Sequence, residues 1–215
     1  MRGTEQVGAK AWLSLAPEHS FVRFADARGS LVNFETTNAN LVSNNWLTQS
    51  SYITAQALQN RIYLDTLSQR NLYAQMLGDL LLGYLKKFNY DGFAHEIQQR
   101  ILQINPENLT ALIVDANIKM QIAAAEIKRA GNPPEEKLPQ YPAAYRAYLS
   151  MQQAYARVDD LGYQSMPPEA YQAWLKSFEA AKEKQENKEL KEKLQKEIKL
   201  LKSLPKPKVI YNKNN

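Results

Sequence analysis

The hydrophobic periodicity of this 215-residue chain changes near residue 50. Before that point, Ser20–Ala25 and Ser30–Thr36 are short runs rich in Val, Phe and Thr, and Asp26–Gly29 separates them. This arrangement is typical of a β-hairpin with Gly29 in the left-handed conformation. After residue 50, apolar residues recur every three to four positions, as in helices. The change predicts an α+β fold that is mostly α, with a small antiparallel hairpin followed by a helical array.

The expected helices are separated by turn and proline signals. Asn38–Asn45 is rich in Asn and is expected to be irregular. Gln69–Phe88 has an apolar residue every fourth position: Leu72, Met76, Leu80, Tyr84 and Phe88. Asn105 is the expected N-cap of a later helix, with Pro106 at its first position. The expected helices are Ser51–Arg61, Gln69–Phe88, Phe93–Asn105, a helix from Pro106 to about Arg129, and Ala143–Val158.

The helical hairpin at 71–105, followed by Pro106, has the shape of a tetratricopeptide unit. Its cues are Tyr84, Tyr90, Ala94, Ile101 and Pro106. A second unit would start near Asn108 with Ala111 and Ala116. The chain has no clean period of about 34 residues. Two ordinary antiparallel helices explain the same pattern, and both interpretations stay open.

The C-terminal third contains two breaks and a long expected helix. Gly131–Pro142 holds four prolines and is expected to be a loop, and Gly162–Pro168 is a second break. From Glu169 a helix is expected to reach about Ser203. Its first part, with Trp174, Leu175 and Phe178, should pack on the body of the protein. Its last part has only a narrow apolar stripe, which should be mobile or dock on a partner: Leu190, Leu194, Ile198 and Leu201.

Three regions follow from these breaks: 1–48 with the hairpin, 50–181 with the helical array, and 182–215 with a charged helix and tail. The last region holds 11 Lys and 5 Glu, so it carries all of the chain's excess positive charge. The body is close to neutral, and this excludes a nucleic-acid interface spread over the protein. The charged helix is a candidate for a protein partner, a coiled coil or a membrane surface.

Composition excludes several kinds of site. There are no cysteines and only two histidines, His19 and His95, so we expect neither a metal site nor a cofactor. Mean hydropathy is −0.52. No apolar run approaches the length of a transmembrane helix, and no signal peptide is visible in these residues. The cellular location stays unknown.

His19 and Glu35 are the candidate chemical groups. His19 opens one expected strand and Glu35 ends the next. If Ala27–Gly29 is a three-residue loop, Asp26 pairs with Ser30, and His19 lies diagonally from Glu35 on the same face. A four-residue loop would put them on opposite faces. A carboxylate beside an imidazole fixes its tautomer and raises its basicity, as in the base and orienting groups of a nucleophilic triad.

Around these residues, Ala9–Asn40 resembles the transglutaminase-like superfamily. The resemblance rests on Ala16-Pro17-Glu18-His19 followed by Val32-Asn33-Phe34-Glu35-Thr36-Thr37-Asn38. It is closest to the bacterial branch in which helical repeats follow a papain-like core, and it continues loosely to about residue 105. The resemblance implies a catalytic cysteine on an upstream helix, with His19 and Glu35 at the histidine and acidic positions.

The chain departs from that family at the nucleophile, because it contains no cysteine. Thr4–Gly8 resembles the end of the helix that carries the cysteine, so we expect the chain to start inside the domain. We therefore expect a non-catalytic helical-repeat module that binds another protein, with His19 and Glu35 as vestigial site residues. The alternative is a cysteine-dependent acyl-transfer or peptidase-like enzyme whose cysteine lies on a missing segment.

Overall fold

We describe a computed structural model of the chain. It describes residues 10–173 except Asn38, together with Lys176, Lys188, Glu192, Lys193, Gln195 and Lys196. The chain divides into two compact units, 1–167 and 168–215, and each is considered by itself. The first unit contains the sheet and the helices discussed below, which confirms the expected α+β, mostly α fold.

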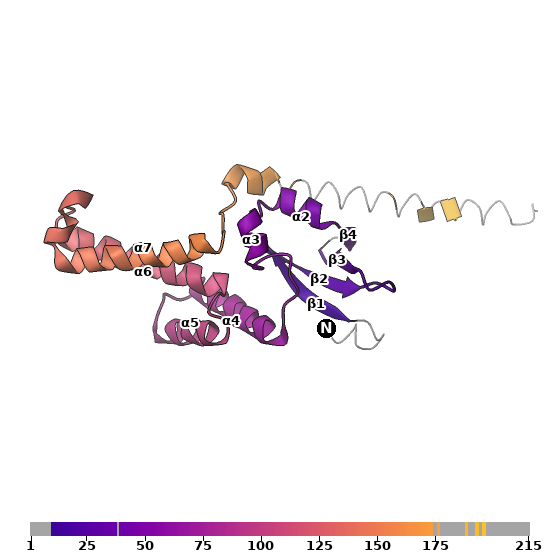
Figure 1. The fold of residues 1–215 in the computed structure, drawn as a ribbon, viewed down its shortest axis with the longest axis horizontal. Helices are drawn as coiled ribbons and strands as arrows, with labels where there is room; N and C mark the ends of the chain where they lie inside the picture. The colour runs from indigo at the N-terminus through magenta and orange to yellow at the C-terminus, as the bar shows by residue number, and fades with distance from the viewer. Residues whose placement is uncertain are drawn as a thin grey trace, which may run out of the picture. The chain divides into compact units, whose positions relative to one another are not determined.

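Four strands form an antiparallel meander (Figure 1): β1 (Ala11–Ala16), β2 (His19–Ala25), β3 (Leu31–Glu35) and β4 (Asn40–Val42). Pro17 and Glu18 connect β1 to β2. The β2–β3 turn is the expected one, because Asp26 N–H donates to the Ser30 carbonyl at 2.9 Å. Asp26 Oδ1 also accepts from the Arg28 and Ser30 N–H groups, at 2.8 Å each, and Gly29 has a φ of 80°. These bonds fix the register of β2 against β3.

One face of the sheet packs against two short helices, α2 (Asn44–Ser50) and α3 (Ala55–Gln59). The shared core joins residues of the strands, the helices and the segment after α3: Ala16, Phe21, Leu47, Ile53, Ala57, Tyr63 and Leu64. That segment runs along the free edge of β1, where the Leu64 and Leu67 N–H groups donate to the Leu15 and Leu13 carbonyls. The sheet is therefore held between α2, α3 and residues 63–67.

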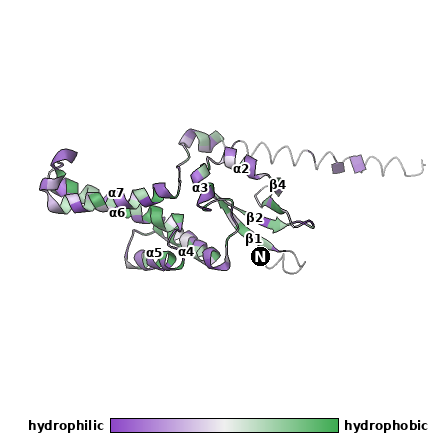
Figure 2. Ribbon diagram, in the orientation of Figure 1, coloured by the Kyte–Doolittle hydropathy of each residue, from purple (hydrophilic) through white to green (hydrophobic). Residues whose placement is uncertain are grey.

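Two helical hairpins follow. The first pairs α4 (Gln69–Leu85) with α5 (Gly92–Ile104), and the second pairs α6 (Leu109–Arg129) with α7 (Pro142–Asp160) (Figure 1). A 3-10 helix, η1 (Glu135–Gln140), occupies the proline-rich connection. Hydrophobic and hydrophilic residues lie side by side along these helices (Figure 2). The helices of each hairpin pack on each other through buried apolar residues, and α4 also leaves large apolar residues such as Met76 and Leu80 exposed.

Hydrogen bonds connect the C-terminal end of the second hairpin to the region around α3. Thr54 Oγ1 donates to the Gly162 carbonyl at 2.7 Å, and the Gln56 and Asn60 side chains donate to the Asp160 carbonyl. Gly162 has a φ of 80°, and a Cβ there would lie 2.6 Å from the Ala57 backbone nitrogen. Only glycine fits this joint without a shift of the backbone.

Several local expectations are wrong. The Asn-rich segment contains β4, because the Asn33 side chain and the β3 ladder support it. The expected helix Ser51–Arg61 is only α3, since Thr54 caps a new helix by accepting from the Ala57 N–H. Asn105 ends α5 instead of starting α6. Asn108 is the actual N-cap of α6 and accepts from the Ala111 N–H at 3.0 Å.

The expected helix from Glu169 to about Ser203 lies mostly outside the described residues. Residues 168–173 are helical. Trp174, Leu175 and Phe178 lie outside the described residues, as do the apolar positions of the narrow stripe: Leu190, Leu194, Ile198 and Leu201. Their packing stays a prediction.

Candidate functional site

The register of β2 and β3 brings His19 and Glu35 together. Val22 lies opposite Phe34 and Arg23 opposite Asn33. One step further along this ladder, Glu35 faces Phe21, so His19 lies diagonally from Glu35 on the same face. The His19 Nε2 atom is hydrogen-bonded to the Glu35 Oε2 atom. This confirms the predicted geometry of the pair.

Glu35 is fully buried and its carboxylate is held at both oxygens. Oε2 contacts His19, and Oε1 accepts from the Thr37 N–H at 2.9 Å. Burial alone would raise the pKa of this carboxyl, but the hydrogen bonds from His19 and Thr37 outweigh burial and lower the pKa below its usual value. Glu35 therefore stays ionised in the folded protein at neutral pH.

The His19 side chain is 13% exposed, whereas Glu35 is completely covered. His19 is thus the more accessible member of the pair, and the buried Glu35 carboxylate orients its ring. The Nε2 atom is the ring nitrogen that contacts Glu35. The arrangement supplies a base and its orienting group.

No cysteine accompanies this pair, because the chain contains none. Ser14 lies on the same face of the sheet and is fully buried, and its Oγ has no hydrogen-bond partner within the residues that the structure describes. A Ser14–His19 hydrogen bond is therefore absent. Asn38, the last residue of the motif on which the family resemblance rests, lies outside the described residues.

A polar cluster lies beside His19 and Glu35 on the same face of the sheet, and no sequence motif predicts it. The Arg23 guanidinium donates to the Leu64 carbonyl and to Asn44 Oδ1, and the Asn33 amide donates to Asn44 Oδ1 at 2.7 Å. Burial lowers the pKa of Arg23, and the negative charge of Asp65 opposes that change. These bonds connect β2 and β3 to the start of α2 and to the segment beside β1. They position the sheet, and with it His19 and Glu35.

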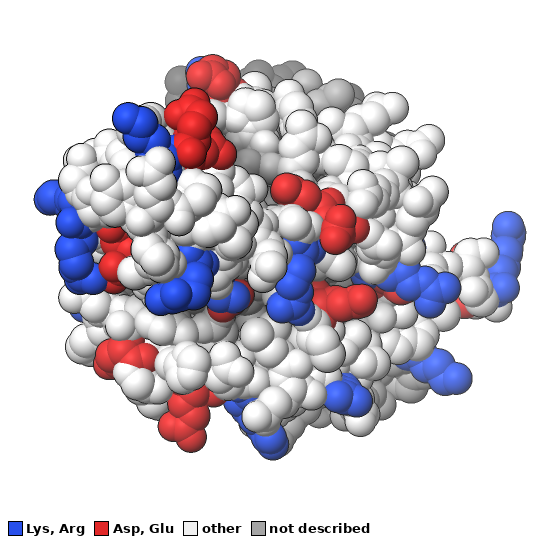
Figure 3. All heavy atoms as spheres, turned by 60° about the vertical axis from the view of Figure 1, so that its left-hand side comes forward, with Lys and Arg blue, Asp and Glu red and all other residues white. Residues whose placement is uncertain are grey.

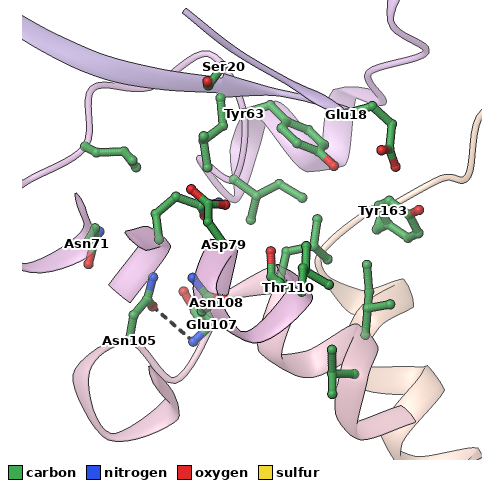
Figure 4. A pocket seen from close by; sticks show the side chains of 18 of the residues that line it. Glu18, Ser20, Tyr63, Asn71, Asp79, Asn105, Glu107, Asn108, Thr110 and Tyr163 are labelled. Carbon is green, nitrogen blue, oxygen red and sulfur yellow. Dashed lines mark hydrogen bonds between the residues drawn. The ribbon is translucent and has the colours of Figure 1, made fainter. Parts of the chain in front are cut away.

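A groove of about 1120 Å³ opens beside His19. It is lined from β1 and the β1–β2 turn, from residues 60–67, from α4, from the α5–α6 connection and from α6 (Figure 4). Leu13, Leu82 and Ile113 are among its apolar residues, and Asn71 and Asn117 are among its polar ones. These segments lie far apart in the sequence, so no local sequence motif predicts the groove.

The described residues contain no group of three His, Cys, Asp or Glu side chains that could hold a metal ion. In the same part of the chain, no helix is both long and apolar enough to cross a membrane. Basic and acidic side chains are interspersed on the face of the protein that Figure 3 presents.

Comparisons of the chain with protein families, with curated proteins and with solved structures found no match.

Proposed function

We propose that this chain is a non-catalytic protein-binding module, built from a transglutaminase-like sheet remnant and helical-repeat-like hairpins. The groove between the sheet and the helices is its binding surface. The observation that carries this proposal is the size of the groove together with its origin in five separate segments. A volume of about 1120 Å³ exceeds most small-molecule pockets and suits a segment of a partner protein.

The experiment places a photo-crosslinking amino acid at Gln121, an exposed residue of α6 that lines the groove. The matched control carries it at Gln153, an exposed residue of α7 that does not line the groove. Both chains are irradiated in cells of the native host, and the cross-linked proteins are identified by mass spectrometry. The proposal expects a defined partner from position 121 and none from position 153. Equal cross-linking from both positions, or none from 121, contradicts it.

A second function is favoured by the His19–Glu35 pair. A histidine held by a buried, ionised carboxylate is the base half of a cysteine-dependent acyl-transfer or peptidase site. The resemblance to transglutaminase-like proteins supports the same function. It requires a cysteine, and this chain has none.

The coding sequence upstream of Met1 distinguishes the two functions. An in-frame segment with a cysteine on a predicted helix favours the enzyme. If that cysteine is present, the longer chain should hydrolyse or transfer acyl groups, and His19→Ala should abolish the activity. A longer chain without any thiol-dependent turnover leaves the binding module as the function.

A further inference from the structure

The groove carries an excess of negative charge. Four carboxylates line it: Glu18, Asp65, Asp79 and Glu107. Among the lining residues, all of which the structure describes, Arg61 is the single Lys or Arg, and its Nε lies 3.9 Å from Asp65 Oδ2. This pair leaves three carboxylates to set the sign of the potential along the groove. A groove lined by one sign of charge concentrates ligands of the opposite sign.

Glu18 is one of the carboxylates that line the groove. It lies in the β1–β2 turn with a φ of 56°, and its side chain is turned toward Tyr63 and Tyr163 (Figure 4). Burial raises the pKa of the Tyr63 phenol, and the nearby Tyr163 and Glu18 raise it further, so Tyr63 stays neutral. Tyr63 belongs to the buried core, whereas Tyr163 is partly exposed. A carboxylate beside the Tyr163 ring attracts an ammonium or guanidinium group both by charge and through the ring face.

The rest of the lining suits a peptide backbone. Eight Asn and Gln side chains line the groove: Asn60, Asn71, Gln75, Asn89, Asn105, Asn108, Asn117 and Gln121. Some of these amides already bond within the protein: Asn60 donates to the Asp160 carbonyl, and Asn108 caps α6. A side-chain amide such as that of Asn71 or Gln121 offers the same donor and acceptor as a peptide group and can pair with an extended chain. Apolar residues such as Leu82 and Phe88 lie between the polar positions and can contact aliphatic side chains.

We propose that the ligand of the groove is a basic peptide segment, with a lysine or arginine side chain seated between Glu18 and Tyr163. This inference rests on the proposed binding function and adds the chemistry of the partner. Asp79 and Glu107 contact further basic side chains along the same segment. Phosphate-bearing ligands are disfavoured, because the lining carboxylates repel them.

The test measures fluorescence anisotropy of a labelled nine-residue peptide, in which lysine alternates with leucine and threonine, against the full chain. A matched peptide carries glutamate in place of lysine. The proposal expects binding of the lysine peptide alone. It also expects about tenfold weaker binding when sodium chloride rises from about 50 mM to about 500 mM, because salt screens exposed charges.

The groove variant combines Glu18→Gln, Asp79→Asn and Glu107→Gln, which are exposed positions. The control variant combines Glu96→Gln, Glu136→Gln and Asp159→Asn, which are exposed and lie outside the groove. Both variants change the net charge by the same amount. Loss of an exposed charge contact weakens binding by about two- to fivefold, so the groove variant should bind about tenfold or more weakly. The control variant should bind like the unmodified chain.

Equal weakening in both variants overturns the inference, because it would show attraction to the overall charge. Equal binding of the lysine and glutamate peptides also overturns it. A dimer of the chain that dissociates in the groove variant, seen by sedimentation velocity, overturns it by making a second copy the occupant. If the peptide fails to bind but position 121 still cross-links a partner, this inference is wrong and the binding function stands.

Discussion

At the scale of single residues, His19 and Glu35 depend on each other. The buried carboxylate is stabilised by the imidazole and by the Thr37 N–H, and the imidazole is oriented by the carboxylate. Both residues hold their positions through the β2–β3 register, which the Asp26 turn sets. The His19–Glu35 pair is thus part of the hydrogen bonding of the sheet.

Replacing Glu35 should therefore destabilise the fold. We expect Glu35→Gln to lower the free energy of unfolding at neutral pH by about 1–3 kcal/mol, because it weakens buried hydrogen bonds to a charged acceptor. Urea denaturation at pH 7 measures this change. Glu96→Gln, at an exposed position of α5, is the control and should leave stability unchanged. Equal stability of Glu35→Gln and the unmodified chain would contradict the assigned bonds.

The same carboxylate should make stability depend on pH. The pKa of Glu35 is lowered in the folded chain, so its stabilising contribution is present above the unfolded pKa of about 4.3. The contribution is lost as the pH falls through the folded pKa. We expect the stability difference between the unmodified chain and Glu35→Gln to shrink as the pH falls from about 5 to about 3. A difference that grows over this range would show that the pKa is raised instead.

The purified chain should have no thiol-dependent activity. It has no cysteine, so neither amide hydrolysis nor acyl transfer through a thioester is expected, and iodoacetamide should not label a thiol. Mass spectrometry after labelling, and release of amine from model amides, check this. Turnover that persists in this chain and disappears in His19→Ala would establish a different nucleophile.

At the scale of elements, helix packing depends on small residues that the periodicity of large ones does not reveal. On α4 the buried positions are Ala74, Gly78 and Leu81. The regularly spaced Met76 and Leu80 are 61% and 51% exposed. A Cβ on Gly78 would already lie 3.4 Å from Thr110 Cγ2, which shows how closely α4 approaches α6. Hydrophobicity alone selects the wrong face of this helix.

The elements themselves could be predicted where a local signal dominates. The β2–β3 turn follows from Asp26 and Gly29, and the helices from about residue 69 to 129 follow from their periodicity. Capping at Thr54 and Asn108 could not be separated from competing Ser and Asn positions nearby. The strand β4 has only three residues, and its partner is chosen by tertiary contacts.

The joint between α3 and the end of α7 should be sensitive to glycine substitution. Gly162→Ala places a Cβ at a φ of 80° and 2.6 Å from the Ala57 nitrogen. We expect this variant to lose about 2 kcal/mol or more of stability. Gly83→Ala in α4 is the matched control, since a Cβ there meets nothing within 4 Å. It should be neutral or stabilising by up to about 1 kcal/mol.

Thermal unfolding of the two variants and the unmodified chain measures both effects. A Gly162→Ala chain that unfolds at the same temperature as Gly83→Ala would mean that the α3–α7 joint is not closely packed.

At the scale of the whole molecule, the groove is a property of the assembled first unit. The sheet and both hairpins contribute to it, and residues as distant as Leu13 and Tyr163 line it. The sequence reveals its chemical groups only as scattered Asn, Gln, Asp and Glu residues. These side chains line one groove because the β1 edge, residues 60–67 and the approach of α4 to α6 bring them together.

Amide NMR of the isotope-labelled full chain tests most directly whether this groove is the binding surface. The lysine peptide is titrated into the chain while backbone amide shifts are recorded. We expect shifts concentrated at groove residues such as Glu18, Asp79 and Asn117, with Gln153 and other exposed residues of α7 unchanged. Shifts confined to α7, or spread evenly over the surface, would contradict it.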